Sequence, residues 1–143
     1  MTMIETYTAF IDTLSKLTAE KKCIWTTVAS FTASQTDNQR LKHFLLSYNK
    51  YIYSTKSLPI INEYDSLCAK LDNGFIYIFA VTEGTKKYLL LGVQNGIDKM
   101  ISKINNEYML QDELDCLYEV IGIKENNMEN FEFIEKIISD YDN

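Results

Sequence analysis

The sequence predicts an α+β fold, in which an antiparallel β-meander of about three to four strands packs with about four to five helices. Two observations carry this prediction. Apolar residues recur at spacings of three and four toward both ends of the chain, as they do on one face of a helix. Between them, apolar extended stretches are separated by the turn signals Asp72–Gly74 and Glu83–Lys87. Because the chain has 143 residues, we expect one domain spanning residues 1–143.

The first helix is expected to begin after Thr2 and to end near Lys22. Thr2 and Glu5 form a capping box, in which the hydroxyl accepts a hydrogen bond from the Glu5 amide. The apolar positions that follow lie at helical spacing: Ile4, Tyr7, Ile11, Leu14 and Leu17. The next segment, Cys23–Phe31, is rich in β-branched and aromatic residues. This composition favours a short strand, and the start of another helix remains open as an alternative.

A second helix is expected after the capping box Thr36–Gln39, with Leu41, Phe44, Leu45 and Tyr48 on its apolar face. It should end before Pro59, since the residue before a proline avoids the α region. Toward the C-terminus, Ile97–Ile104 fits a short helix, with a fourth strand as the alternative.

Two further helices are expected near the C-terminus. The first contains the apolar positions Leu110, Leu114, Leu117 and Ile121, and Gly122 suits the position that follows a helix end. Asn127 would cap the last helix. Its core face is expected to consist of Phe131, Ile134, Ile137 or Ile138, and Tyr141.

The meander is predicted from three extended segments, Tyr64–Leu71, Phe75–Val81 and Tyr88–Gln94. The middle segment is apolar at every position, so both of its faces need cover. Phe75, Tyr77, Phe79 and Val81 should point to one face, and Ile76, Ile78 and Ala80 to the other. Helices of the same chain, a second copy of the chain, or a ligand could provide the cover on the second face.

The net charge of −6 is concentrated at the C-terminal end, because residues 106–143 contain 2 Lys and 11 Asp or Glu. One interpretation is that these residues are the solvated faces of two helices. The other is that they attract a basic protein partner. The candidate partner-binding residues are Asp112, Glu113, Asp115, Glu119, Glu129 and Glu132.

Catalytic and metal-binding motifs are missing from the sequence. The chain contains one histidine, His43, and three widely separated cysteines, Cys23, Cys68 and Cys116, which we expect to be free thiols. No glycine-rich phosphate loop, nucleophile elbow or His-Glu-x-x-His sequence occurs. We therefore expect neither an enzyme nor a cofactor.

Tyrosines interleaved with lysines indicate a candidate ligand site, since aromatic rings can stack on bases while lysines hold phosphates. The candidate residues for a nucleotide are Tyr51, Tyr53, Lys86, Lys87 and Tyr88. Tyrosines at core margins or in a protein interface explain the same pattern. The acidic pI of about 4.8 opposes binding to duplex DNA.

The sequence also predicts a cytoplasmic protein with no membrane association. No apolar run approaches the roughly 20 residues that span a bilayer. The N-terminal residues, MTMIETYTAF, lack the basic and apolar regions of a signal peptide.

The stretch Tyr64–Asn95, followed by LQDELDCLYEVIG and an acidic terminal helix, resembles small uncharacterised proteins of low-GC Gram-positive bacteria and their phages or mobile elements. The resemblance covers roughly the C-terminal half of the chain. It implies a small accessory domain and supplies no catalytic residue. From the composition and this resemblance together, we expect a non-enzymatic binding protein. It would act as an antagonist that occupies a protein partner, with self-association or nucleotide binding as alternatives.

Overall fold

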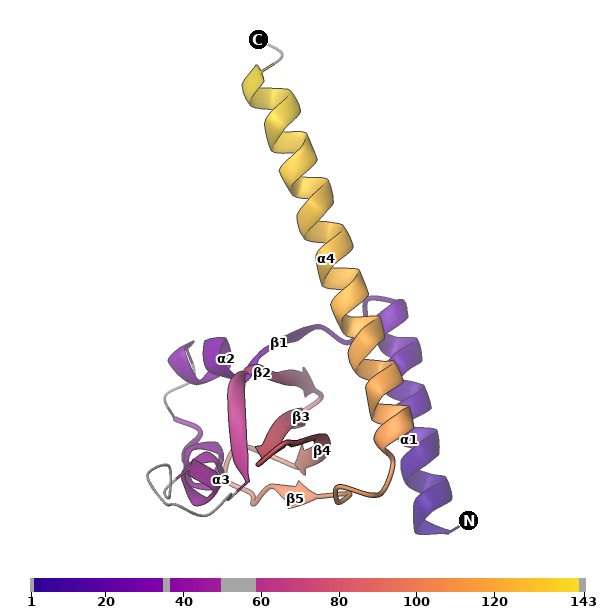
Figure 1. The fold of residues 1–143 in the computed structure, drawn as a ribbon, viewed down its shortest axis with the longest axis vertical. Coiled ribbons are helices and arrows are strands. Elements are labelled where there is room, and N and C mark those ends of the chain that lie inside the picture. The colour runs from indigo at the N-terminus through magenta and orange to yellow at the C-terminus, as the bar shows by residue number, and fades with distance from the viewer. Residues whose placement is uncertain (1, 35–36, 50–58, 142–143) are drawn as a thin grey trace.

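The computed structural model describes residues 2–34, 37–49 and 59–141. Within these residues, four helices and five strands follow one another along the chain (Figure 1). They are α1 (Met3–Ala19), β1 (Trp25–Thr27), α2 (Val28–Ser34), α3 (Gln39–Asn49), β2 (Ile60–Leu71), β3 (Gly74–Glu83), β4 (Lys86–Gln94), β5 (Ser102–Lys103) and α4 (Gln111–Tyr141). The predicted α+β class is confirmed, with more strands than the sequence indicated.

The strands form one antiparallel sheet in the order β1-β2-β3-β4-β5. Both predicted turns are confirmed. Leu71 pairs with Gly74, and Asp72 between them adopts a φ of 53°. Glu83 pairs with Lys86, and Gly84 between them adopts a φ of 64°. Aspartate and glycine tolerate this left-handed region, which is why these residues close the tight hairpins.

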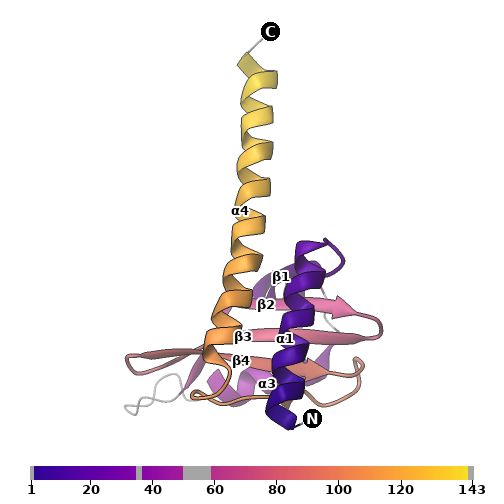
Figure 2. The same ribbon diagram turned by 90° about the vertical axis from the view of Figure 1, so that its right-hand side faces the viewer.

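Helices of the same chain cover both faces of the sheet. On one face, Ile76 and Ile78 of β3 pack in a core with residues of α1 and α4. On the other face, Phe75, Tyr77 and Phe79 pack in a core with residues of α2 and α3. Figures 1 and 2 show the same layers, with α1 and α4 side by side against one face. The predicted alternation along β3 is confirmed, and neither face needs a second copy or a ligand for its cover.

The N-terminal elements follow the local signals closely. The Thr2 side chain accepts a hydrogen bond from the Glu5 amide at 3.1 Å, so the predicted cap of α1 is confirmed. The segment Cys23–Phe31 divides between the two alternatives, because β1 is a short edge strand and α2 begins at Val28. The Trp25 indole nitrogen donates to the Thr18 hydroxyl at 2.9 Å, which ties β1 to the end of α1.

The expected cap at Thr36 is wrong for α3. Thr36 itself lies outside the described residues, and α3 begins at Gln39, later than a cap at Thr36 would place it. Asn38 is the capping residue, since its Oδ1 accepts from the Leu41 amide at 3.2 Å. Tertiary structure decides this, because the Asn38 side chain is completely buried between α3 and the sheet.

The segment Ile97–Ile104 is not a helix. It forms turns and then the short edge strand β5, in which Ser102 pairs with Val93. The strand alternative is therefore confirmed. Pairing with β4 satisfies backbone groups that a short helix at this position would leave open.

The largest departure from expectation lies at the C-terminal end. The chain does not end a helix at Gly122 and begin another at Asn127, because α4 runs as one helix from Gln111 to Tyr141. A glycine inside a helix costs only about 0.5–1 kcal/mol relative to alanine, so it permits a helix end without requiring one. In Figures 1 and 2 the first part of α4 packs beside α1, and the remainder extends away from the sheet.

Candidate functional site

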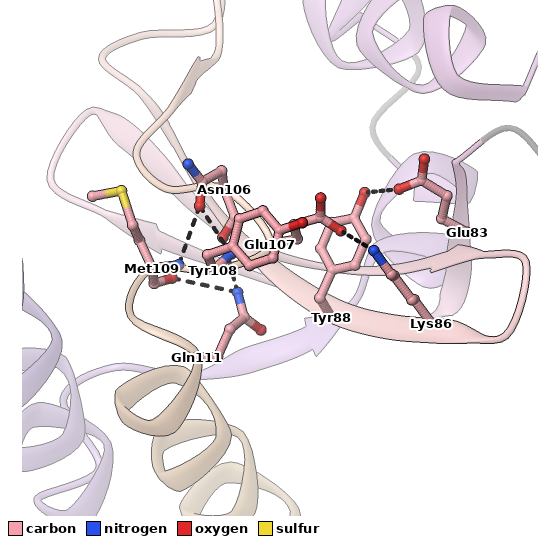
Figure 3. Close-up of polar contacts among 8 residues, drawn as sticks. All are labelled: Glu83, Lys86, Tyr88, Asn106, Glu107, Tyr108, Met109 and Gln111. Carbon is pink, nitrogen blue, oxygen red and sulfur yellow. Dashed lines mark hydrogen bonds and ion pairs between the residues drawn. The ribbon is translucent and has the colours of Figure 1, made fainter.

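Two of the three predicted nucleotide residues in β4, Lys86 and Tyr88, are engaged by carboxylates of the chain itself. Tyr88 donates its hydroxyl hydrogen to Glu83 at 3.3 Å, and Lys86 forms an ion pair with Glu107 at 3.6 Å. The Lys86 ammonium also lies 5.9 Å from the centre of the Tyr108 ring (Figure 3). Burial, and secondly the charge of Glu83, raises the pKa of Tyr88 to about 12, so its hydroxyl stays protonated at neutral pH. Lys86, predicted to hold a phosphate, and Tyr88, predicted to stack on a base, are thus already engaged within the chain.

Beside this group, a polar turn connects β5 to the start of α4. The Asn106 side chain accepts from the amides of Tyr108 and Met109 at 2.9 and 3.1 Å (Figure 3). Gln111 accepts from the Leu89 amide at 2.9 Å and donates to the Leu89 carbonyl at 2.8 Å. These contacts hold the first turn of α4 against β4. Of the residues drawn in Figure 3, Asn106 and Gln111 therefore anchor the helix.

Lys87 and Tyr88 also line a hollow of about 290 Å³ beside the start of α4. Asp65 of β2 and Asp115 of α4 line the same hollow, and the Tyr118 hydroxyl donates to the Asp65 carbonyl at 2.8 Å. The repulsion between a phosphate and the two carboxylates exceeds the attraction of the phosphate to the single lysine. The hollow is therefore a poor nucleotide site. The other two predicted ligand residues, Tyr51 and Tyr53, lie outside the described residues.

The structure brings together three of the predicted acidic residues. Asp112, Asp115 and Glu119 are exposed and lie at spacings of three and four along α4, which places them on one side of the helix. This side is opposite the buried stripe of Leu114, Leu117 and Ile121. We call these three residues the acidic root.

The other predicted acidic residues lie away from this group. Glu113 is half-buried, and Glu132 is exposed on another side of α4. The side chain of Glu129 is outside what the structure describes. The predicted set of six is therefore not one surface, because a helix distributes neighbouring residues around its axis.

The feature that sequence reasoning misinterpreted is an apolar face at the end of α4. Six large side chains there are 41–83% exposed, although four of them, counting either Ile137 or Ile138, were expected to form a core: Phe131, Phe133, Ile134, Ile137, Ile138 and Tyr141. We call these six residues the apolar tip. At ~1.5 Å per residue, an unbroken helix places them about 15–30 Å beyond Ile121, the last residue of α4 that the structure describes as buried. They therefore lie too far along the helix to reach the core that contains Ile121.

The apolar tip has a defined direction. At ~100° per residue, its six side chains fall within an arc of about 160°, while Glu132, Glu135 and Lys136 lie on the opposite arc. On the same helical projection, the centre of the apolar arc lies about 50° from the centre of the acidic root and roughly opposite the buried stripe. One side of α4 therefore presents carboxylates near the sheet and large apolar side chains farther along.

Groups suited to catalysis are sparse in the described part of the chain. Burial raises the pKa of Cys68 to about 12 and also raises the pKa of Cys23, which disfavours the nucleophilic thiolate of both. His43 is exposed on α3. Among the described residues, no group of three or more His, Cys, Asp or Glu side chains is placed to hold a metal ion.

Across the residues that the structure describes, none of the helices combines the length and apolar character that crossing a membrane requires. Comparisons of the chain with protein-family models, curated proteins and solved structures found no match.

Proposed function

We propose that this chain is a non-enzymatic protein-binding module whose interaction surface is the outward side of α4. The single observation that carries the proposal is the exposed apolar tip. Monomeric proteins rarely leave contiguous apolar surface of this size open, and such surfaces mark interaction sites. The sheet and α1 serve to anchor α4 and to fix the direction in which it projects.

The acidic root supports a basic partner. Its three carboxylates lie on the same side of α4 as the apolar tip, and the region from residue 106 onward has 2 Lys against 11 Asp or Glu. Complementary charge raises the rate of association and orients the encounter of the acidic root with such a partner. A partner with a basic surface would therefore be captured through this side of the helix.

The biological role that we propose is that of an antagonist that occupies its partner. A small chain without a catalytic constellation can act by blocking a surface, which requires only binding. An origin in a phage or mobile element, which the sequence pattern of the C-terminal half implies, is part of the same proposal. Nucleotide binding is the weaker candidate, because Glu107 and Glu83 already engage Lys86 and Tyr88.

The test uses two variants with equal changes of charge on the same helix. Full-length chain is first used to capture partner proteins, and each captured protein is then purified for kinetic measurement. Asp112→Asn/Asp115→Asn/Glu119→Gln removes the acidic root, whereas Glu132→Gln/Glu135→Gln/Asp140→Asn removes three carboxylates that lie outside it. We expect the first variant to associate about tenfold more slowly at low salt, since steering accelerates association by about 10–1,000-fold. The second variant should stay near the parent rate.

Salt provides the second readout. Exposed charges are screened beyond about 10 Å at 0.1 M salt, so association of the parent chain should slow as salt rises. The acidic-root variant should show a shallower dependence. If the association rate changes neither with salt nor with removal of the acidic root, these carboxylates do not have the proposed role.

A further inference from the structure

We propose that the apolar tip is occupied by the same surface of a second copy of this chain, as an antiparallel helix pair. This inference rests on the proposed function of α4 as the interaction element and names the occupant of its apolar part. The acidic root stays outside the pair and remains open to a basic partner. The proposal rests on the exposed area of the apolar tip, on the spacing of its residues along α4, and on the distance that would separate the two sheets.

The exposed area is large enough for a dimer. At roughly 200 Å² for an aromatic side chain, the 63%, 63% and 83% exposure of Phe131, Phe133 and Tyr141 leaves about 400 Å² open. Ile134, Ile137 and Ile138 are a further 53%, 41% and 54% exposed. Together the six side chains approach the roughly 800 Å² that each partner contributes to a standard interface.

The spacing of the tip makes it complementary to itself. When two copies run antiparallel with Lys136 opposite Lys136, Phe131 lies opposite Tyr141 of the second copy and Ile134 lies opposite Ile138. A two-fold interface requires such reciprocal matching, because the same patch serves both subunits. Glu132, Glu135 and Lys136 lie on the polar arc, so like charges stay at the margin of the pair. Antiparallel packing also opposes the two helix dipoles.

Clearance allows the pair to form. About 22 Å of helix separate Lys136 from Ile121, the last residue of α4 that the structure describes as buried. The paired segment extends only about 8 Å on each side of Lys136. Figures 1 and 2 show α4 projecting well beyond the sheet and α1. The two sheets would therefore lie at opposite ends of the helix pair without contact.

The alternatives fit the tip less well. A lipid surface prefers a basic polar arc, whereas this arc carries Glu132, Glu135 and Asp140 against Lys136. A parallel pair would bring two acidic roots side by side, which like charge disfavours. Each alternative predicts a different outcome in the experiments that follow.

The first experiment measures the mass of the full chain by sedimentation equilibrium between about 1 and 200 μM. We expect the mass to rise with concentration from 16.6 kDa toward twice that value. Ile134→Gln/Ile138→Gln should weaken dimerisation at least tenfold. The matched control Glu135→Gln/Lys136→Gln keeps the net charge and should dimerise as the parent does. Circular dichroism and Trp25 fluorescence verify that each variant is folded.

The second experiment reports the direction of the pair. In a Cys116→Ser background, Phe131→Cys mixed with Tyr141→Cys should form a disulfide between the two variants under oxidation. Phe131→Cys alone should not, because an antiparallel pair separates the two Phe131 positions by about 15 Å along the axis, whereas disulfides need Cα atoms within about 7 Å. Efficient cross-linking between two copies of the Phe131→Cys variant would show that the pair is parallel and would contradict the antiparallel arrangement.

Three results would overturn the proposal. They are a monomer throughout the concentration range, a dimer that survives Ile134→Gln/Ile138→Gln, and a monomer that co-sediments with phosphatidylcholine/phosphatidylglycerol vesicles. The proposed function is separable from it. If the chain is a monomer and altering the apolar tip abolishes binding to a purified partner, the proposed function stands and the helix pair is rejected. If the chain is a dimer and no substitution in α4 affects partner binding, the helix pair stands and the proposed function is rejected.

Discussion

Asn38 and Gln94, far apart in the sequence, exchange two amide hydrogen bonds of 3.1 Å in the core of the protein. Tyr77 completes the group, because its hydroxyl donates to Gln94 at 2.6 Å and accepts from Asn38 at 3.1 Å. All three side chains are completely buried. A buried polar group is stable only when its partners are present, so this cluster fixes how α3, β3 and β4 align.

Substitutions in this cluster should differ in severity. Tyr77→Phe removes one hydroxyl and should cost about 0.5–1.5 kcal/mol, since Gln94 and Asn38 keep each other as partners. Gln94→Leu should cost more, about 3 kcal/mol or above, because Asn38, Tyr77 and two backbone carbonyls lose a partner together. Urea unfolding followed by Trp25 fluorescence measures both. An equal loss in the two variants would contradict a cooperative cluster.

Asn105 closes the edge of β4 beyond β5. Its Oδ1 accepts from the Leu91 amide at 2.7 Å, and its Nδ2 donates to the Leu89 and Met109 carbonyls at 3.0 and 2.9 Å. Asn105→Ala should cost about 1–3 kcal/mol, because these buried backbone groups lose their partners. Asn105→Asp keeps the acceptor but loses the donors, so it should regain stability at low pH, where a protonated carboxyl can donate. The exposed substitution Asn95→Asp is the charge-matched control, and equal losses at 95 and 105 would contradict this role.

Gly122 lies inside α4, and a methyl group added there would meet no other part of the protein within 4 Å. Gly122→Ala should therefore stabilise the helix by about 0.5–1 kcal/mol, since alanine loses less backbone freedom on folding. The melting temperature measured by circular dichroism should rise by about 2–4 °C for each kcal/mol. A decrease would show that the chain needs glycine there, for example to bend α4.

Stability at alkaline pH should depend on Tyr88. Its pKa is about 12 in the folded protein against an ordinary value of 10, chiefly because it is buried and secondly because of Glu83. Between these values the unfolded chain loses the proton first, so the free energy of unfolding should fall as pH rises from 10 to 12. Burial also raises the pKa of Tyr77, which contributes in the same direction.

Two variants separate the contribution of Tyr88. Tyr88→Phe cannot titrate, so its stability should fall less steeply than that of the parent chain over this range. Glu83→Gln removes a charge that raises the Tyr88 pKa and should give an intermediate slope. Denaturant midpoints measured from pH 9 to 12 provide the comparison, and three identical slopes would exclude Tyr88 as a contributor.

Nucleotides should leave the thermal stability of the protein unchanged. A nucleotide at 100 times its dissociation constant would stabilise the protein by about 2.7 kcal/mol. We expect no shift with ATP or GTP, because ion pairing and hydrogen bonding already engage Lys86 and Tyr88. A reproducible rise that Lys87→Ala abolishes would restore the nucleotide alternative.

The sequence by itself determined the central meander of the sheet, β2 to β4. Side chains of a strand alternate between its two faces whatever lies around them, so apolar residues at every position of Phe75–Val81 required cover on both sides. The turns at Asp72 and Gly84 follow equally from local preference, because few residues adopt positive φ without strain. The α+β class and the cap at Thr2 depend on neighbouring residues alone and could be predicted for that reason.

Only the tertiary structure decided what α4 does. Gly122 and Asn127 are local signals worth about 1 kcal/mol each, which a continuous helix overrides. The periodicity of Phe131, Ile134, Ile138 and Tyr141 predicts one apolar face, and the same periodicity fits a core and an interface equally well. The contacts of α4 with α1 and β4 set the direction of the helix, and this direction carries the apolar tip away from the core. Its exposure is therefore a property of the whole fold.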